Sequence, residues 1–217
     1  MRCVMEIVSS VVTPSTSLPI DLAWARTHLK SISGEEDDLI ISWIAAATQY
    51  FQEYTSRPPM IETREAWLDA FPIERTIELP NPPLVEVVSV KYVSGDGTII
   101  DFSDGSPAVP SWQTRSPLGV YARRGWVELK DGVQWPTARG DSGSVRIQYR
   151  AGYADDVSEV PDMIRAALLL LVGSFERFRS ETYVAEGGSI SRLPFGVDQM
   201  LLAFKNTALA SQVLHRL

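Results

Sequence analysis

The stretch LIISWIAAATQYFQEYTSRPPM, residues 39–60, contains the change of pattern that decides the fold. Its apolar side chains recur at steps of three and four residues, which is the spacing of one face of an α-helix. This face consists of Ile40, Trp43, Ile44, Ala47, Phe51 and Tyr54. Pro58 and Pro59 end the helix, because a proline disfavours the helical conformation in the residue before it. A different pattern begins directly afterwards.

A shorter helix is expected before this one. Asp21 is placed to cap it, and Leu22, Ala25 and Leu29 lie on one face at helical spacing. Residues 1–18 end in a turn-rich run that cannot continue a helix, so we expect a flexible or docking N-terminal arm there. The folded part therefore begins near residue 19.

Residues 60–153 alternate short β-branched and aromatic runs with proline and glycine, a pattern typical of an antiparallel sheet. The clearest hairpin turn is Ser94-Gly95-Asp96-Gly97, because Asp-Gly tolerates positive φ. The expected strands are residues 63–68, 76–79, 85–93, 98–102, 120–122, 126–129 and 144–149.

Helical spacing returns at Pro161 and continues to about residue 180, and a last short helix is expected at residues 197–204. The residues between these helices contain Gly187 and Gly188 and are interpreted as a mobile loop. The sequence therefore predicts an α+β fold. A small bundle of about four helices carries an antiparallel β region inserted between helices 2 and 3. The expected parts are an arm (1–18), a helical core (19–59 and 154–204), a β domain (60–153) and a C-terminal tail (205–217).

The composition argues against several classes of protein. A net charge of -7 at pH 7 does not suit a broad phosphate-binding surface. The only histidines, His28 and His215, are not paired in sequence with a nucleophile, so we predict no enzyme and no catalytic residue. Cys3 and two distant histidines lack the spacing of zinc ligands, and no metal or other cofactor is expected. The apolar run at residues 166–173 is too short to span a membrane.

Tryptophan and arginine residues leave a binding function open. The tryptophans suit core and subunit contacts, or alternatively a sugar-binding face, so a β-rich glycan- or receptor-binding module remains the second hypothesis. These tryptophans are Trp24, Trp43, Trp67, Trp112, Trp126 and Trp135. The arginines of the β region favour pairs on the face of the sheet over a surface that meets DNA or an acidic partner. They are Arg123, Arg124, Arg139, Arg146 and Arg150.

Four stretches, in this order and spacing, carry a resemblance to a known family. The first runs from Pro19-Ile20-Asp21-Leu22 to Tyr54-Thr55-Ser56-Arg57, and the second is Leu79-Pro80-Asn81-Pro82-Pro83-Leu84 with the strand after it. The third runs from Trp135-Pro136 through Ala151-Gly152-Tyr153 to Val160-Pro161 and Ile164. The last is Leu193-Pro194-Phe195-Gly196-Val197 with Leu201-Leu202. Over residues 19–204 the chain resembles the head-tail connector (adaptor, head-completion) family of long-tailed bacteriophages and gene transfer agents. It departs from the family at the N-terminal arm and at residues 174–179.

The resemblance implies a structural virion protein that forms a homo-oligomeric ring, commonly of twelve subunits. Such a ring connects the capsid portal protein to a tail-side stopper or tail-completion protein and lets DNA pass without specific contacts. An acidic chain suits this role, because strong phosphate contacts would hold the DNA. The expected location is the head-tail junction of the virion, after synthesis in the bacterial host cytoplasm, with no membrane partner.

The resemblance also suggests where the partners bind. We expect the C-terminal tail to order against the portal through an apolar set of residues. This set is Leu209, Val213, Leu214 and Leu217. We expect contacts between subunits of the ring at Trp43, Tyr50, Tyr54, Arg177 and Arg179.

Overall fold

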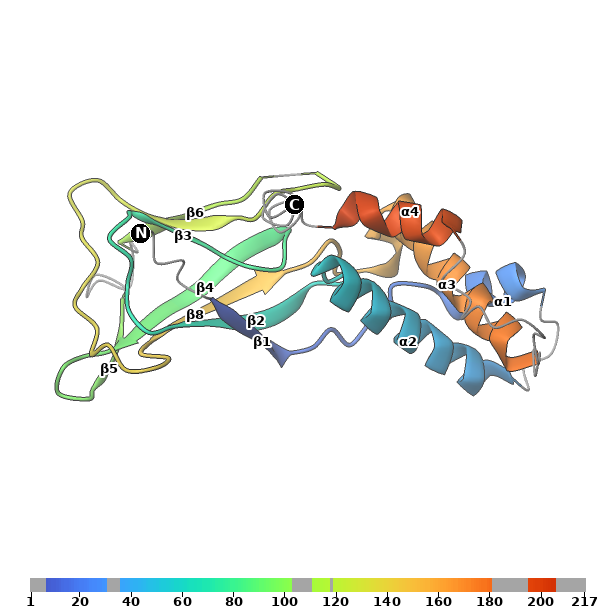
Figure 1. Cartoon of the computed structure of the whole chain (residues 1–217), viewed down its shortest axis with the longest axis horizontal. Helices are drawn as coiled ribbons and strands as arrows, with labels where there is room; N and C mark the ends of the chain where they lie inside the picture. Colours follow the sequence, from blue (N-terminus) through green and yellow to red (C-terminus); the bar gives the residue numbers. More distant parts are fainter. Residues whose placement is uncertain (1–6, 31–35, 103–110, 118, 181–194, 206–217) are drawn as a thin grey trace, which may run out of the picture. The chain divides into compact units, whose positions relative to one another are not determined.

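The computed structural model describes residues 7–30, 36–102, 111–117, 119–180 and 195–205. The chain forms two compact units, each made of two separate segments (Figure 1). We call Met1–Ser15 with Ile61–Gly152 the β unit, and Thr16–Met60 with Tyr153–Leu217 the helical unit. The predicted α+β class is confirmed, with every strand except β1 following the second helix and preceding the third.

The helical unit has four helices in its described part. They are α1 (Leu22–Leu29), α2 (Asp37–Thr55), α3 (Asp162–Ser180) and α4 (Phe195–Phe204). A short 3-10 turn, η2 (Val157–Glu159), precedes α3. Asp21 caps α1 as predicted, since its carboxylate accepts a hydrogen bond from the backbone N–H of Ala23 at 2.8 Å. The helices are therefore the elements that the apolar spacing predicts.

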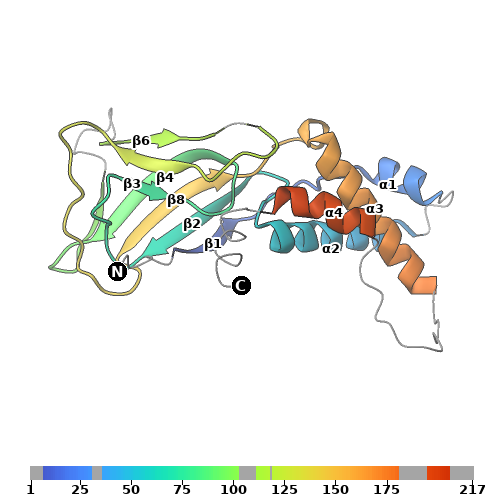
Figure 2. The ribbon, with the colours of Figure 1, turned by 45° about the horizontal axis from the view of Figure 1, so that its top comes forward.

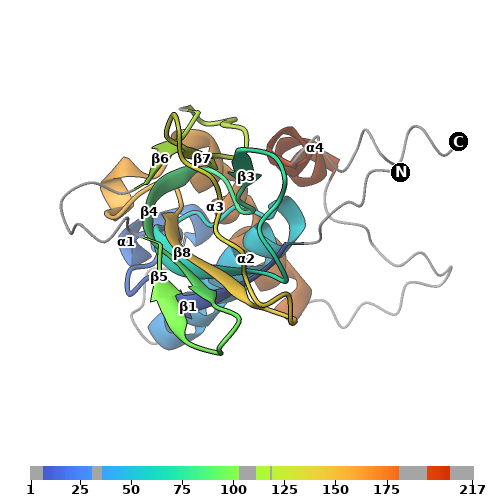
Figure 3. The same ribbon diagram turned by 90° about the vertical axis from the view of Figure 1, so that its left-hand side faces the viewer.

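The core of the helical unit lies between α2 and α3, which run in opposite directions (Figure 1). Both helices bury residues at helical spacing, and each of these side chains is 0% exposed. They are Ile40, Ile44, Ala47 and Phe51 on α2, and Ile164, Ala167, Leu168 and Leu171 on α3. α1 and α4 lie on opposite sides of the α2–α3 pair (Figure 3).

The β unit contains a five-stranded antiparallel sheet in the order β1-β2-β8-β4-β5 and a three-stranded sheet in the order β3-β7-β6 (Figure 2). The strands of the larger sheet are β1 (Val8–Thr13), β2 (Glu62–Leu68), β4 (Leu84–Val93), β5 (Ile99–Asp101) and β8 (Val145–Ala151). Those of the smaller sheet are β3 (Thr76–Glu78), β6 (Trp112–Arg115) and β7 (Trp126–Leu129).

Strand β8 shows why the larger sheet has two different faces. Its burial alternates along the strand: Val145, Ile147 and Tyr149 are 0% exposed, whereas Arg146 and Gln148 on the other face are half-buried. The buried row packs with residues of the smaller sheet, including Ile77 of β3 and Val127 of β7, into one apolar core. On β8, the other face of the large sheet carries the polar side chains of Arg146, Gln148 and Arg150.

Residues 8–13 differ from the flexible arm that the sequence predicts, because they form β1 along the edge of β2. Ser9 anchors this strand: its hydroxyl donates to the Asn81 side-chain oxygen at 2.8 Å and accepts from Arg64 Nε at 3.2 Å. Arg64, 8% exposed, also donates to the Glu62 carboxylate. A polar network under the edge of the sheet therefore holds the N-terminal segment in place.

The hairpin predicted at residues 94–97 joins β4 and β5. Gly97 has φ +88°, and its N–H donates to the Ser94 carbonyl at 2.9 Å. The strand predicted at residues 120–122 is wrong, because Ala122 N–H closes a turn onto the Gly119 carbonyl at 3.0 Å. Strand β6 is not predicted from the sequence, because Trp112 is followed by three polar residues, Gln113, Thr114 and Arg115. The strand is defined by its antiparallel pairing with β7.

Candidate functional site

A buried arginine holds the last turn of α4, at the point where the described chain ends. Arg57 is 4% exposed and follows Ser56, the residue with φ 56° that closes α2. Its Nε donates to the Phe204 carbonyl oxygen at 2.6 Å, and Nη1 donates to the Tyr153 hydroxyl at 3.0 Å. Carbonyl groups at the end of a helix carry partial negative charge, so the guanidinium stabilises this end of α4.

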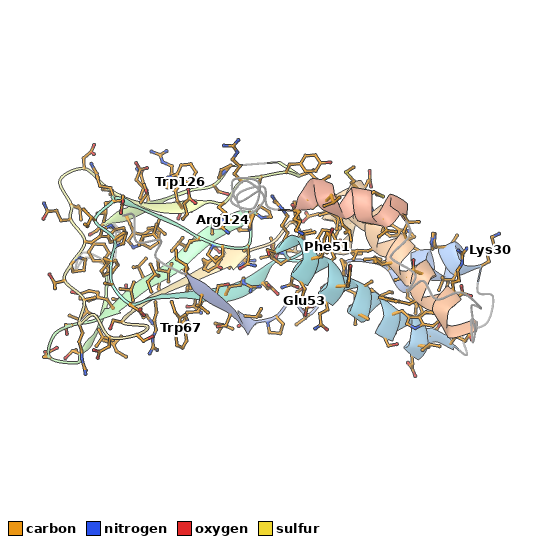
Figure 4. The ribbon with its side chains drawn as sticks, viewed as in Figure 1. Lys30, Phe51, Glu53, Trp67, Arg124 and Trp126 are labelled. Carbon is orange, nitrogen blue, oxygen red and sulfur yellow. The ribbon has the colours of Figure 1, made fainter. Side chains whose placement is uncertain are left out.

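Aromatic contacts fix the same turn. The ring of Phe51, on the inner side of α2 (Figure 4), meets the ring of Phe204 edge-on with 5.6 Å between centroids. The ammonium group of Lys205 lies 4.8 Å from the centroid of the Tyr54 ring, a cation–π contact. We call Phe51, Tyr54, Arg57, Tyr153, Phe204 and Lys205 the tail root, because residues 206–217 continue from it.

Sequence reasoning did not assign a role to Arg57. Two of the stretches that carry the family resemblance contain residues of the tail root: the first ends at Arg57, and the third includes Tyr153. They are 96 residues apart and meet only in the folded helical unit. The only local sign of this role is the position of Arg57, directly between the end of a helix and Pro58. An arginine at such a position is ordinarily expected to lie on the surface in contact with water.

The three aromatic residues predicted to contact a neighbouring subunit share one flank of α2. Tyr50 and Tyr54 stack with 5.9 Å between ring centroids and 15° between planes, and Trp43 on the same flank is half-buried. Lys205 of the same chain covers the Tyr54 ring. Intramolecular packing therefore uses part of this flank.

The remaining predicted contact residues are placed in part. Arg177 is exposed on α3. The side chain of Arg179 lies outside the described residues, as do the predicted portal-docking residues of the tail. Those docking residues are Leu209, Val213, Leu214 and Leu217. The predicted loop at residues 182–192 also falls outside the described part of the chain.

The acidic and histidine side chains of the described residues are the groups that could form a reaction centre or metal site. Within the described residues, no three His, Cys, Asp or Glu side chains are grouped as ligands, and no helix is long and apolar enough to cross a membrane. His28 is exposed on α1. Asp37 accepts from Arg26 Nε at 2.7 Å. Hydrogen bonds from Ser158 lower the pKa of the Asp156 carboxyl, which caps η2. These acids have structural roles at helix starts.

The tryptophans of the β unit are used within the chain rather than arranged as a sugar platform. Trp112 is 9% exposed. Trp135 stacks on Phe71 with 4.8 Å between centroids and 8° between planes, and its indole N–H donates to a backbone carbonyl. Trp67 (Figure 4), the most exposed of them at 41%, lies beneath the guanidinium of Arg146 at 5.1 Å. Sugar-binding faces need exposed aromatic rings, so the packing of Trp112 in the core and of Trp135 against it argues against a sugar platform at these two residues.

Two of the β-unit arginines singled out in the sequence are paired with acids: Arg150 on β8, and Arg139 in the loop before it. Arg150 donates to Glu86 across the sheet at 3.0 Å, and Arg139 contacts Asp141 at 2.7 Å. Only the Arg150–Glu86 pair joins two strands, as expected of sheet-face partners, whereas Arg139 and Asp141 both lie in a loop. These pairs neutralise both arginines. They offer no continuous basic surface to a phosphate backbone.

The chain thus has an α+β fold in which a helical bundle is interrupted by an antiparallel β unit, and comparison with solved structures finds the same fold. A chain in the neck of an empty gene transfer agent (GTA) particle, with C6 symmetry, matches with a TM-score of 0.70 and 20% identity. The match covers 92% of this chain and 95% of that chain.

Two further structures are similar. A chain in the virion of a native GTA particle matches with a TM-score of 0.69 at 20% identity, over 92% of this chain and 95% of that one. A chain in the neck of a native GTA particle, with C12 symmetry, matches with a TM-score of 0.64 at 20% identity, over 93% of this chain and 96% of that one. No protein-family model and no curated protein matches the sequence. The fold predicted from the family resemblance is therefore the fold of these chains.

Proposed function

We propose that this chain is a structural protein of a virion neck, in which a ring of copies connects the capsid portal to the tail and lets DNA pass. The observation that carries the proposal is the shared fold over nearly the full length of both chains, found in the neck of GTA particles. The C6 and C12 symmetry of those necks supports a closed ring. No catalytic step is part of this function.

The tail root supports a specific role for the C-terminal tail. Arg57 and Phe51 hold the end of α4, so the chain is fixed up to the point where residues 206–217 begin. A segment that starts from a fixed point loses less conformational entropy when it orders on a partner. We propose that this tail docks on the portal through its apolar residues, while a tail-side stopper or tail-completion protein binds elsewhere on the ring.

A truncation tests the docking role. Removing residues 206–217 keeps Lys205 and the tail root, so we expect a folded subunit with an unchanged melting temperature that no longer binds purified portal protein. The matched controls are two full-length variants. Serine at Leu209, Val213, Leu214 and Leu217 should abolish binding, whereas alanine at the polar tail positions Asn206, Ser211 and Gln212 should not. Portal binding of unchanged affinity by the truncated chain would overturn the docking role.

A further inference from the structure

One row of side chains on α3 is turned to solvent. Met163, Leu170 and Arg177 are spaced seven residues apart, so they lie along one side of the helix. Met163 is 38% and Leu170 is 39% exposed, and Arg177 is exposed as well. Ala166, between the first two, is also exposed. Two large apolar side chains in line on one helix face mark a surface suited to protein contact. We call Met163, Leu170 and Arg177 the α3 row.

A matching row lies on α2. Asp38, Ala45 and Gln52 have the same spacing of seven residues, and the first two are exposed. Ile41, one turn before Ala45, is 39% exposed and widens the apolar part of this surface. Alanine lets another helix approach closely, because it leaves a shallow surface between longer side chains. We call Asp38, Ala45 and Gln52 the α2 row.

The two rows face opposite sides of the helical unit. The side of α3 that faces α1 is marked by Arg165, which lies 4.5 Å over the Trp24 ring, and the α3 row lies away from it. The side of α2 that faces α4 is marked by Tyr54 under Lys205, and the α2 row lies away from that. Because α1 and α4 are on opposite sides of the α2–α3 pair (Figure 3), the two rows point in opposite directions.

We infer that the α3 row of one copy packs on the α2 row of the next copy around the ring. This inference rests on the proposed ring, since a closed ring needs two different and complementary faces on each subunit. Within one copy, α2 and α3 run in opposite directions (Figure 1). Neighbouring copies in a ring differ by a small rotation, so α3 of one copy also runs opposite to α2 of the next. The rows then pair in antiparallel order: Arg177 meets Asp38, Leu170 meets Ala45, and Met163 meets Gln52.

The pairing accounts for the chemistry of both rows. At one end of the contact, the positive charge of Arg177 meets the exposed carboxylate of Asp38. At the centre, the large apolar side chain of Leu170 lies over the small side chain of Ala45. At the other end of α3, Asp162 is already paired with Arg165 of its own helix. The contact replaces the aromatic flank of α2 as the interface, because Tyr54 is covered within its own chain.

Cysteine crosslinking tests this contact. In a Cys3→Ser background, Ala45→Cys combined with Leu170→Cys should give, on oxidation, a ladder of dimers, trimers and larger species. The chain is examined both alone and mixed with its portal protein, with electron micrographs of each sample. Each single cysteine variant should give no crosslinked product. A dimer from either single variant would overturn the inference, because it would mean a face that pairs with itself.

Two further outcomes separate the interface from the function. Rings in the micrographs without a ladder from the double variant would overturn this contact and leave the proposed ring intact. The absence of both rings and ladder, with portal and without it, would overturn both proposals.

A charge exchange checks the register without cysteines. Asp38→Arg should weaken ring assembly on the order of tenfold or more, and adding Arg177→Asp should restore it. Leu170→Glu should also prevent assembly while leaving a folded monomer. Leu202→Glu is its control, since Leu202 is 42% exposed on α4 and lies outside both rows. Failure of the reversed pair to recover assembly would contradict the register, and equal effects of the two leucine variants would contradict the face.

Discussion

Arg57 and Phe204, 147 residues apart in the sequence, are joined by a hydrogen bond of 2.6 Å from the guanidinium Nε to the last carbonyl oxygen of α4. The bond ties the end of α2 to the end of α4. It gives the C-terminal tail a defined starting point, which is the structural basis for its proposed role in docking.

Replacing Arg57 with methionine should destabilise the helical unit by about 1.5–3 kcal/mol, because the Phe204 carbonyl and the Tyr153 hydroxyl lose a charged partner. Urea unfolding measures this loss. Hydrogen exchange should rise in the amides of α4 before global unfolding. Arg57→Lys is the control, since it keeps the charge and should retain part of the stability. Unchanged exchange in α4 of the methionine variant would show that Arg57 does not hold the helix.

The stability of the β unit should depend on Tyr149 at high pH. Burial raises the pKa of this phenol above 10.0, so the folded state keeps its proton to a higher pH than the unfolded chain does. The protonated Tyr149 phenol therefore contributes to the free energy of unfolding. This contribution is complete below the unfolded pKa of about 10 and is lost as the pH rises through the pKa of the folded state.

We therefore expect the free energy of unfolding to fall more steeply between about pH 9 and pH 11 in the natural protein than in Tyr149→Phe. Urea titrations at several pH values measure both slopes. The comparison removes the effect of the other tyrosines and lysines, which both proteins share. Equal slopes would mean that the Tyr149 phenol ionises as easily in the fold as outside it.

Gly125 should not tolerate a side chain. A Cβ atom there would lie 2.5 Å from Leu84 Cδ2 and 3.0 Å from the Arg115 carbonyl oxygen, closer than packed atoms approach. Gly125→Ala should therefore cost about 1–3 kcal/mol of stability through overpacking. Thermal unfolding measures the change. The control is Gly95→Ala, where nothing lies within 4 Å, and a similar loss in both variants would disprove the packing explanation.

The isolated chain should not bind sugar polymers. Trp67→Ala should leave carbohydrate retention unchanged, because neither this variant nor the natural chain is expected to bind sugar, and losing the Arg146 contact should cost at most about 1 kcal/mol of stability. Trp135→Ala should destabilise the β unit, because it removes the stack on Phe71. Affinity electrophoresis in polysaccharide gels checks retention. Retention of the natural chain that disappears in Trp67→Ala would favour the glycan-binding hypothesis.

The helices were predictable because their signals are local. The apolar stripe of α2, with Ile40, Ile44 and Phe51, is visible in consecutive residues, and these residues form the core as expected. The hairpin after β4 was predictable for the same reason, since Asp96-Gly97 alone specifies the turn.

Strand β1 and the tail root depend on distant partners. Val8 and Val11 are exposed and do not alternate with buried residues, so the sequence of β1 does not show a sheet face. Its pairing requires β2, far along the chain. Arg57 likewise acquires its role only from Phe204 and Tyr153. Residues whose function comes from such tertiary contacts cannot be assigned from spacing alone.

Electron microscopy of the purified chain mixed with its portal protein tests the central claim most directly. The account predicts a ring of this chain seated coaxially on the portal, with density for the tails reaching from the ring into the portal. Portal particles without an added ring, under conditions where both proteins are folded, would contradict it.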